Sequence, residues 1–448
     1  MSRNYSARHY LAFQRDGLHR DHPSPEAWSE YVRSAVKALG MSPQLEYRVV
    51  SGPSRRQAYF TLKDNSIAEY CSDPRRLCPI IVDEPPTRDF YTEINQEKHR
   101  QTHGLTAIGA DLPIHFTDYW SPTESRDPIF GTRRMANELM GVLDDNSAEP
   151  GTGANVVIVD QGLNQAYIEH LGGAFMGGWS LARRSRPGKF AVGHASMLAR
   201  NLLKVAPDAA IFDLPIVPET IENIAQFVSG VHAALDQVVE TIQHLRKGDE
   251  EQWQRPWIFV NAWAAYNTTG EQPRGDYTQR VEHQFNQLIS AVALEFDMVF
   301  AAGNCGQFCP SRLCGPDDVG PGQSIIGANS HPDVLTVGAV RADGVWLGYS
   351  SQGPGALCKE KPDICAASQF REDADATTSN TGTSAACAIA AGVVAALRSR
   401  FRSMALTPAA LKRILIDTAT GKPAGAPWDN QLGNGIINAA AACSRVRE

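Results

Sequence analysis

Residues 156–162 have the sequence VVIVDQG, an apolar run that ends in the carboxylate of Asp160 and a glycine. A short apolar run of this kind is typical of a strand buried inside a parallel sheet. Further apolar runs alternate with stretches of helical periodicity: runs at 211–217, 257–261 and 299–302, and helical stretches at 221–247 and 278–295. This alternation predicts an α/β fold, with helices on both faces of a mainly parallel, doubly wound sheet.

Three further segments each place a reactive polar group beside an expected strand or helix. GHAS at 193–196 puts His194 before a helical pattern, VFAAGN at 299–304 ends in the amide of Asn304, and NTGTSAA at 380–386 puts Ser384 at the start of a long helix of small residues. The interval between Asp160 and His194 is long enough for a crossover that returns to the same edge of the sheet. Because open α/β sheets build their sites at the carboxyl ends of the strands, we expect the four groups to meet there.

Together these groups supply the parts of a nucleophilic hydrolase. Asp160 can orient the imidazole of His194, which can then deprotonate the hydroxyl of Ser384. The backbone N–H of Ser384 and the positive end of its helix dipole would face the developing oxyanion, with the Asn304 amide as the second donor. Each segment alone is more often structural, but the four in this order favour catalysis.

The order Asp, His, Asn, Ser along the chain resembles that of the subtilisin-like serine proteases, the subtilases. Four further segments are similar to that family: VAPDA at 205–209, LTVGA at 335–339, YSSQGP at 349–354 and KPDI at 361–364. The resemblance covers residues 128–443 and implies a subtilisin-like serine endopeptidase that hydrolyses peptide bonds in protein or peptide substrates. It implies a triad of Asp160, His194 and Ser384. Asn304 would be the oxyanion donor, and the chemistry would need no cofactor; the sequence identifies no structural calcium site.

The chain departs from the family pattern beside each member of the triad. The departures are Gln161 in place of Ser or Thr, Ala195-Ser196 in place of Gly-Thr, and Ala388 in place of Pro. None of them removes a catalytic group. They keep an alternative open, in which the chain is a catalytically weak or inactive subtilase-like protein that binds peptides.

The family's substrate-binding positions fall on five residues: Trp263, Ala264, Ala265, Ala302 and Gly303. The first three replace the usual Ser-Leu-Gly, so the primary specificity of the family does not carry over. A hydrolase that uses the same triad on an ester or lactone is a further alternative. The absence of a Gly-x-Ser-x-Gly elbow argues against its common α/β-hydrolase form.

Residues 1–83 carry a different pattern. Expected strands at 9–13, 45–50, 58–62 and 79–82 alternate with expected helices at 25–39 and 66–71, which predicts a small α+β domain of the split β-α-β type. The domain is similar to the subtilase propeptide and is therefore a candidate intramolecular inhibitor; a permanent accessory domain is the alternative. Residues 84–127 would be the linker, open to cleavage, and residues 128–448 the catalytic domain.

The composition of the chain limits which partners and which cellular location we expect. The net charge of -7 gives no basic surface for nucleic acid, so we expect no nucleic-acid partner. No apolar run approaches the length needed to cross a membrane, and the N-terminal MSRNYS lacks the apolar core of a signal peptide. We therefore expect no membrane partner and a cytoplasmic location by default, with secretion by another route left open.

The nine cysteines leave at least one unpaired thiol in a monomer. Three groups lie close in sequence: Cys71 with Cys78, Cys358 with Cys365, and the trio Cys305, Cys309 and Cys314. Such short loops suit disulfides in an oxidising compartment or inert thiols in a reducing one. A zinc site built on the trio is disfavoured because the paired spacing of zinc modules is missing. Because Cys305 follows Asn304, we expect the trio to shape the loop beside the oxyanion donor.

Overall fold

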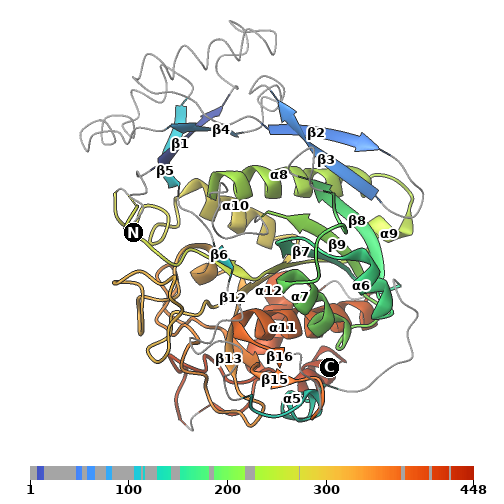
Figure 1. Ribbon diagram of the computed structural model, residues 1–448, viewed down its shortest axis with the longest axis vertical. Helices are drawn as coiled ribbons and strands as arrows, with labels where there is room; N and C mark the ends of the chain where they lie inside the picture. Colours follow the sequence, from blue (N-terminus) through green and yellow to red (C-terminus); the bar gives the residue numbers. More distant parts are fainter. Residues whose placement is uncertain are drawn as a thin grey trace, which may run out of the picture.

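The computed structural model describes most of the chain after residue 128 and several N-terminal strands (Figure 1). The described residues are the strands at 8–14, 47–52, 58–65, 77–82, 105–111 and 115–116, and the segments 129–142, 152–180, 186–216, 228–271, 273–374, 379–402, 406–422 and 425–447. Everything below concerns these residues.

A nine-stranded sheet forms the centre of the described part of the molecule. Its strands lie in the order β14 (Ile364–Ala367), β13 (Leu335–Val340), β12 (Asp297–Ala301), β10 (Trp257–Asn261), β7 (Asn155–Asp160), β9 (Ala210–Pro215), β8 (Ala174–Ser180), β3 (Ala58–Asn65) and β2 (Tyr47–Gly52). Neighbouring strands are parallel from β14 to β3, and only the β2–β3 pair is antiparallel. The predicted doubly wound, mainly parallel α/β fold is confirmed.

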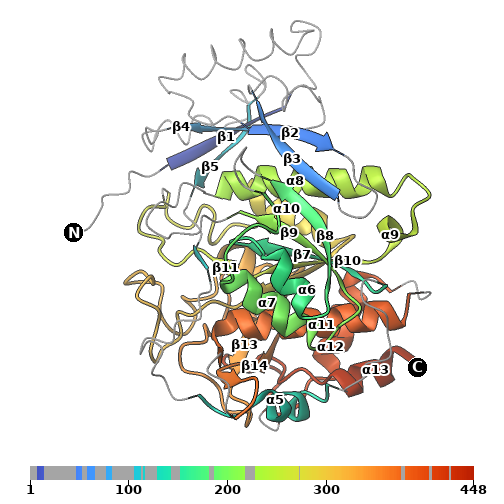
Figure 2. The ribbon, with the colours of Figure 1, turned by 45° about the vertical axis from the view of Figure 1, so that its right-hand side comes forward.

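Helices cover both faces of this sheet, because alternate side chains along each strand enter opposite cores (Figures 1 and 2). Val156 and Ile158 of β7 enter one core, and Val157 and Val159 enter the other. The first core is covered by α6 (Gln165–His170), α7 (His194–Leu203), α11 (Gly382–Arg400), α12 (Pro408–Asp417) and α13 (Ala439–Arg447). The second is covered by α8 (Val228–Leu245), α9 (Glu251–Gln254) and α10 (Gln284–Ala293).

The long helix α11 lies at the centre of the first core. It is apolar and long enough to cross a membrane, but 83% of its most apolar stretch is buried inside the fold, as expected of a core helix. Its small residues let it pack closely against α7. A Cβ added at Gly392 would lie 2.8 Å from Cβ of Val205 and 3.0 Å from the carbonyl oxygen of Leu202.

The helix predicted at 278–295 begins later than expected, at Gln284. The carboxylate of Glu271 accepts hydrogen bonds from the backbone of Gly275, Tyr277 and Thr278, which fixes this stretch as turns. His283 then caps the helix. Of the helix predicted at 221–247, residues 228–245 are helical and 221–227 lie outside the described residues.

The strands between residues 8 and 111 lie beyond α8, at the end of the molecule opposite α5 (Arg133–Leu139) (Figures 1 and 2). All four predicted strands form, but in two sheets. β1 (Arg8–Gln14) lies between β4 (Leu77–Val82) and β5 (Leu105–Asp111), whereas the β2–β3 hairpin extends the large sheet. The edge of β8 offers unpaired backbone groups that β3 satisfies.

The two helices predicted at 25–39 and 66–71 lie outside the described residues. β5 and β6 (His115–Phe116) fall within the stretch predicted as a linker and were not anticipated. The domain boundaries at residues 83 and 127 stay predictions. The remaining described elements are β11 (Trp263–Ala264), β15 (Phe370–Arg371), β16 (Ser379–Asn380) and the short 3-10 helix η3 (Gly327–Ser330).

Candidate active site

Asp160 and His194 meet at the carboxyl edge of the large sheet. Asp160 is the last residue of β7, and His194 is the first residue of α7. Nδ1 of His194 lies 2.9 Å from Oδ1 and 3.0 Å from Oδ2 of Asp160, and both residues are buried. In the tautomer that donates to Asp160, Nδ1 carries the proton, and Nε2 is the ring nitrogen that does not face Asp160.

The loops that follow Asp160 and precede His194 are tied to each other. The backbone N–H of Phe190 donates to the carbonyl of Leu163 at 3.1 Å, and the side-chain amide of Asn164 donates to the carbonyl of Phe190 at 2.7 Å. The ring of Phe190 also packs on Gly162, where an added Cβ would lie 2.3 Å from the ring and φ is +119°. A glycine is therefore needed two residues after Asp160.

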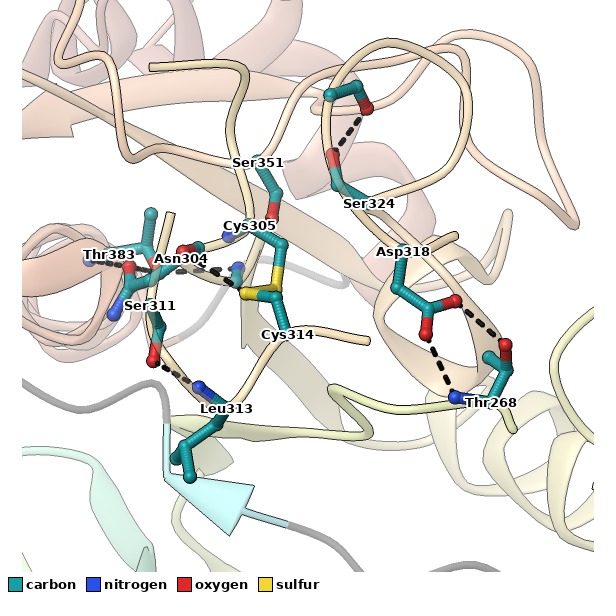
Figure 3. The surroundings of a disulfide bond; sticks show 12 residues. Thr268, Asn304, Cys305, Ser311, Leu313, Cys314, Asp318, Ser324, Ser351 and Thr383 are labelled. Atoms are coloured by element: carbon teal, nitrogen blue, oxygen red, sulfur yellow. Dashed lines mark hydrogen bonds between the residues drawn. A yellow bond between two sulfur atoms is a disulfide. The ribbon is translucent and has the colours of Figure 1, made fainter. Parts of the chain in front are cut away.

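Asn304 is held against the turn that begins α11 (Figure 3). Its side-chain oxygen accepts hydrogen bonds from the backbone N–H of Thr383 at 3.0 Å and from the Thr383 hydroxyl at 2.9 Å. The same hydroxyl accepts from the N–H of Gly303 at 3.2 Å. Because both Thr383 contacts use the oxygen of the amide, the NH₂ group of Asn304 is oriented away from Thr383.

Ser384 is the residue after Thr383 and is fully buried in the first turn of α11. The turn before it is fixed by Gly382, whose φ is +73°, whose N–H donates to the Tyr349 hydroxyl and whose carbonyl accepts from the Ser368 hydroxyl. The first N–H groups of a helix have no partner within the helix and carry its positive dipole end. The backbone N–H of Ser384 is one of these groups.

A partly buried charged cluster ties the helix of His194 to the strand that precedes Ser384. Arg200 of α7 donates to the Asn380 side-chain oxygen at 2.8 Å and to Glu372 at 3.0 Å, and Arg133 of α5 donates to both oxygens of Glu372. Burial alone would raise the pKa of Glu372, but the hydrogen bonds and charge of Arg133, with Asn380 and Arg200, lower it to about 2. Glu372 is therefore ionised at neutral pH.

The predicted substrate-binding residues lie around β11 and the end of β12. The side chain of Trp263 is wholly buried in the second core, where it packs against Phe285 and Phe300 and its indole N–H donates to Asn261. Its backbone belongs to the short strand β11, which pairs antiparallel with β6. The other predicted substrate-binding residues, Ala264, Ala265, Ala302 and Gly303, lie in this strand, next to it or just before Asn304.

A disulfide joins Cys305 to Cys314 and closes a loop that starts directly after Asn304 (Figure 3). Two of the trio are therefore unavailable as thiolate ligands, while Cys309 is an exposed free thiol. No group of three His, Cys, Asp or Glu side chains placed to hold a metal is found within the described part of the chain.

Cys358 and Cys365 are both free rather than paired with each other. Burial raises the pKa of the Cys365 thiol and of the Cys387 thiol, so both are inert at neutral pH. Cys443 is also a free thiol and is half-buried. The side chains of Cys71 and Cys78 lie outside the described residues.

Several residues that shape the site were not assigned from the sequence. Thr383 was inside the quoted NTGTSAA segment but received no role, and Ser351, whose hydroxyl accepts from the N–H of Cys305 at 3.0 Å, was inside a quoted family segment. Asp318 accepts from the backbone and hydroxyl of Thr268 and braces the neighbouring loop (Figure 3). Only the first two lay in segments already quoted for the site.

Comparison with known proteins shows the family of this chain. A model of the subtilase family matches residues 203–435, just over half of the 448 residues; the match includes Asn304 and Ser384 and begins after His194. Mycosin-1 of Mycobacterium tuberculosis is 26% identical over 358 residues, which are 72% of this chain and 75% of mycosin-1.

Two solved structures share the fold. Fervidolysin of Fervidobacterium pennivorans, a keratinolytic enzyme related to subtilisin, is 15% identical with a TM-score of 0.55. The alignment covers 99% of this chain but only 62% of fervidolysin. A lanthipeptide protease is 16% identical with a TM-score of 0.50, and the alignment covers 71% of this chain and 100% of that protein.

Proposed function

Because the chain belongs to the subtilase family, we propose that it is a serine endopeptidase in which Ser384 attacks the peptide bond. The observation that carries the proposal is the buried contact of 2.9 Å between His194 and Asp160 at the same sheet edge as Asn304. The two hydrogen bonds between Asn304 and Thr383 support it further, because Thr383 directly precedes Ser384 and so holds Asn304 close to the start of α11.

In the proposed reaction, His194 takes the proton of the Ser384 hydroxyl through Nε2 as the serine oxygen attacks the carbonyl carbon. Asp160 holds Nδ1–H, fixes the tautomer and stabilises the imidazolium that forms. His194 then gives the proton to the leaving amine, and the peptide C–N bond breaks to leave an acyl ester on Ser384. Water, deprotonated by the same imidazole, hydrolyses the ester and regenerates the hydroxyl.

The developing oxyanion has two proposed donors: the backbone N–H of Ser384 and the NH₂ group of Asn304. The orientation of the Asn304 amide supports this role, because its oxygen is already used by Thr383. A donor fixed before the reaction stabilises the oxyanion without reorganising at the moment of attack.

We also propose that the N-terminal region acts as an intramolecular inhibitor. The antiparallel pairing of β6 with β11 supports this, because Phe116 lies opposite Trp263 and His115 opposite Ala264 on the predicted substrate-binding strand. A segment that occupies this edge would compete with an extended substrate. Incubated wild-type protein should then acquire a cut between residues 83 and 127 that Ser384→Ala does not acquire. An isolated fragment of residues 1–127, which includes β6, should inhibit the cut enzyme, and comparison with residues 1–83 shows whether β6 is required. Full activity of an uncut chain would favour a permanent accessory domain.

The endopeptidase proposal is tested by digesting an unbiased peptide library with wild type, Ser384→Ala and the control Ser444→Ala, which changes an exposed serine of α13. We expect wild type and the control to cleave internal bonds and to react with a fluorophosphonate, and Ser384→Ala to do neither. Loss of the triad serine should lower turnover by on the order of 10⁴-fold or more. A wild type that binds peptides but neither cleaves nor labels would instead be the inactive peptide-binding protein.

A further inference from the structure

A second carboxylate lies buried beside the Asp160–His194 pair. Asp213 belongs to β9, in register with Ile158 of the neighbouring strand β7, and is completely buried. Side chains alternate along β9, so Asp213 shares the face of Ile211, which packs in the core beneath α6 and α7. A charged residue in a strand otherwise made of apolar residues and one proline is unusual, because burial of a carboxylate is unfavourable without specific partners.

The partners of Asp213 come from the two loops that carry the catalytic pair. Oδ2 accepts a hydrogen bond from the backbone N–H of Leu163 at 3.0 Å, three residues after Asp160. The same oxygen accepts from the N–H of Gly188 at 2.9 Å, in the loop that leads into α7. Oδ1 has no hydrogen-bond partner among the described residues. One side chain on a rigid strand therefore fixes both loops at once.

We propose that Asp213 is a positioning residue, whose carboxylate clamps the Leu163 and Gly188 loops and whose charge tunes the Asp160–His194 pair. The proposal rests on the proposed function, since it assigns Asp160 and His194 to the reaction. Asp213 has no role in bond making. It acts by holding the loops that position the imidazole of His194 and by adding a negative charge near that imidazole.

The electrostatic part follows from what surrounds the carboxylate. Burial raises the pKa of Asp213 to about 7, opposed by the Leu163 and Gly188 hydrogen bonds and reinforced by the negative charge of Asp160. The coupling is reciprocal, so ionised Asp213 adds negative charge beside Asp160, and a negative charge close to the pair favours the protonated form of His194.

The other titratable groups of the adjacent elements are engaged elsewhere or exposed. β8 and residues 161–163 carry none, and Lys189 is exposed. Glu169 bonds Gln165, and Arg200 bonds Glu372 and Asn380. His170 lies at the far end of α6 and is exposed. Asp160, with His194 bonded to it, is therefore the group through which we expect the charge of Asp213 to act.

The charge effect can be measured without activity, in a Ser384→Ala background that prevents self-digestion. We would titrate the His194 ring by NMR, assigned with His194→Gln, in the parent, in Asp213→Asn and in Asp297→Asn. Asn is nearly isosteric and its side-chain oxygen can accept both N–H groups, so it removes the charge and keeps the clamp. Asp297 is the matched control: a buried strand carboxylate at the opposite, amino-terminal end of β12, paired with Arg398.

We expect Asp213→Asn to lower the pKa of His194 by on the order of half a pH unit, and Asp297→Asn to leave it unchanged. Equal His194 titrations in the parent and in Asp213→Asn would overturn the charge part of the proposal. If wild type showed no Ser384-dependent cleavage, the proposed function would fail, yet this titration would still report the coupling.

The clamp is tested by turnover. Asp213→Ala leaves the N–H groups of Leu163 and Gly188 without their acceptor, and we expect kcat to fall roughly 10- to 100-fold because the imidazole is misplaced. Asp213→Asn should recover most of that loss, with the acid limb of the kcat profile moved to lower pH. A folded Asp213→Ala, verified by its cooperative thermal transition, that turns over at the wild-type rate would overturn the clamp.

Discussion

Replacing Asn304 by Ala removes two interactions whose effects can be separated. Its NH₂ group is the proposed oxyanion donor, and loss of one such donor lowers kcat by roughly 10² to 10³, which corresponds to about 2.7–4 kcal/mol of transition-state stabilisation. Its oxygen is the acceptor for the N–H and hydroxyl of Thr383, at 3.0 and 2.9 Å in a wholly buried site. Leaving these groups unsatisfied should lower the free energy of unfolding by about 1–3 kcal/mol.

Thr383→Val is the matched control, because it removes the hydroxyl contacts to Asn304 and to the N–H of Gly303 but leaves the NH₂ donor in place. We expect Thr383→Val to lose about 1–3 kcal/mol of stability, similar to Asn304→Ala, with a much smaller loss of kcat. The assays are steady-state hydrolysis of one cleaved peptide and urea unfolding, for both variants and wild type. An Asn304→Ala enzyme with raised KM and unchanged kcat would place Asn304 in ground-state binding and refute the oxyanion role.

Three further changes test other parts of the structure. Glu372→Gln should lower the free energy of unfolding by about 1–3 kcal/mol at pH 7. Because the folded pKa of Glu372 is lowered to about 2, the stability difference between wild type and Glu372→Gln should shrink as the pH falls below the unfolded pKa near 4.5. Urea unfolding of both proteins at pH 7 and pH 4 measures this difference. Replacing both Cys305 and Cys314 by Ser opens a ten-residue loop and should lower stability by about 2–3 kcal/mol, and kcat more than KM, whereas the control Cys309→Ser, at an exposed free thiol, should change neither. Gly392→Ala places a Cβ 2.8 Å from Cβ of Val205. This overpacking should lower the free energy of unfolding by about 1–3 kcal/mol and with it the thermal midpoint. An unchanged midpoint would show that α7 and α11 can move apart at little energetic cost.

The fold and the position of the site were predictable because both follow from local pattern and one rule of sheet geometry. The apolar run before Asp160 identified a buried strand, and the meeting of parallel strand ends at one edge placed His194 beside it, as the 2.9 Å contact shows. The start of α10 was mispredicted because Val281 continues the helical spacing of Phe285, Leu288 and Val292, while Glu271 accepts from the backbone of Tyr277 and Thr278 and holds that stretch in turns.

The groups that hold the site together could not be read from sequence, because their partners lie far apart along the chain. Arg200 and Glu372 are 172 residues apart and Arg133 and Glu372 are 239 apart, so no spacing rule links them. Trp263 shows a second limit of the sequence. Resemblance to a substrate-binding segment says where the backbone runs, and the structure adds that the indole enters the core; a role of the Trp263 backbone in substrate binding stays a prediction.

The location of the protein stays a prediction, and the Cys305–Cys314 disulfide favours the alternative of secretion by another route, because disulfides persist in oxidising compartments and are rare in the cytosol. We therefore expect the protein to work where thiols are oxidised. Cells that make the protein would be quenched in acid and alkylated before lysis, and the cysteines mapped by mass spectrometry. Cys305 and Cys314 should escape alkylation, whereas exposed Cys309 should react and serves as the internal control. Alkylation of all three cysteines would place the protein in a reducing compartment. The loop after Asn304 would then lack its disulfide, and the kcat of the variant with Ser at both 305 and 314 would approximate the activity in the cell.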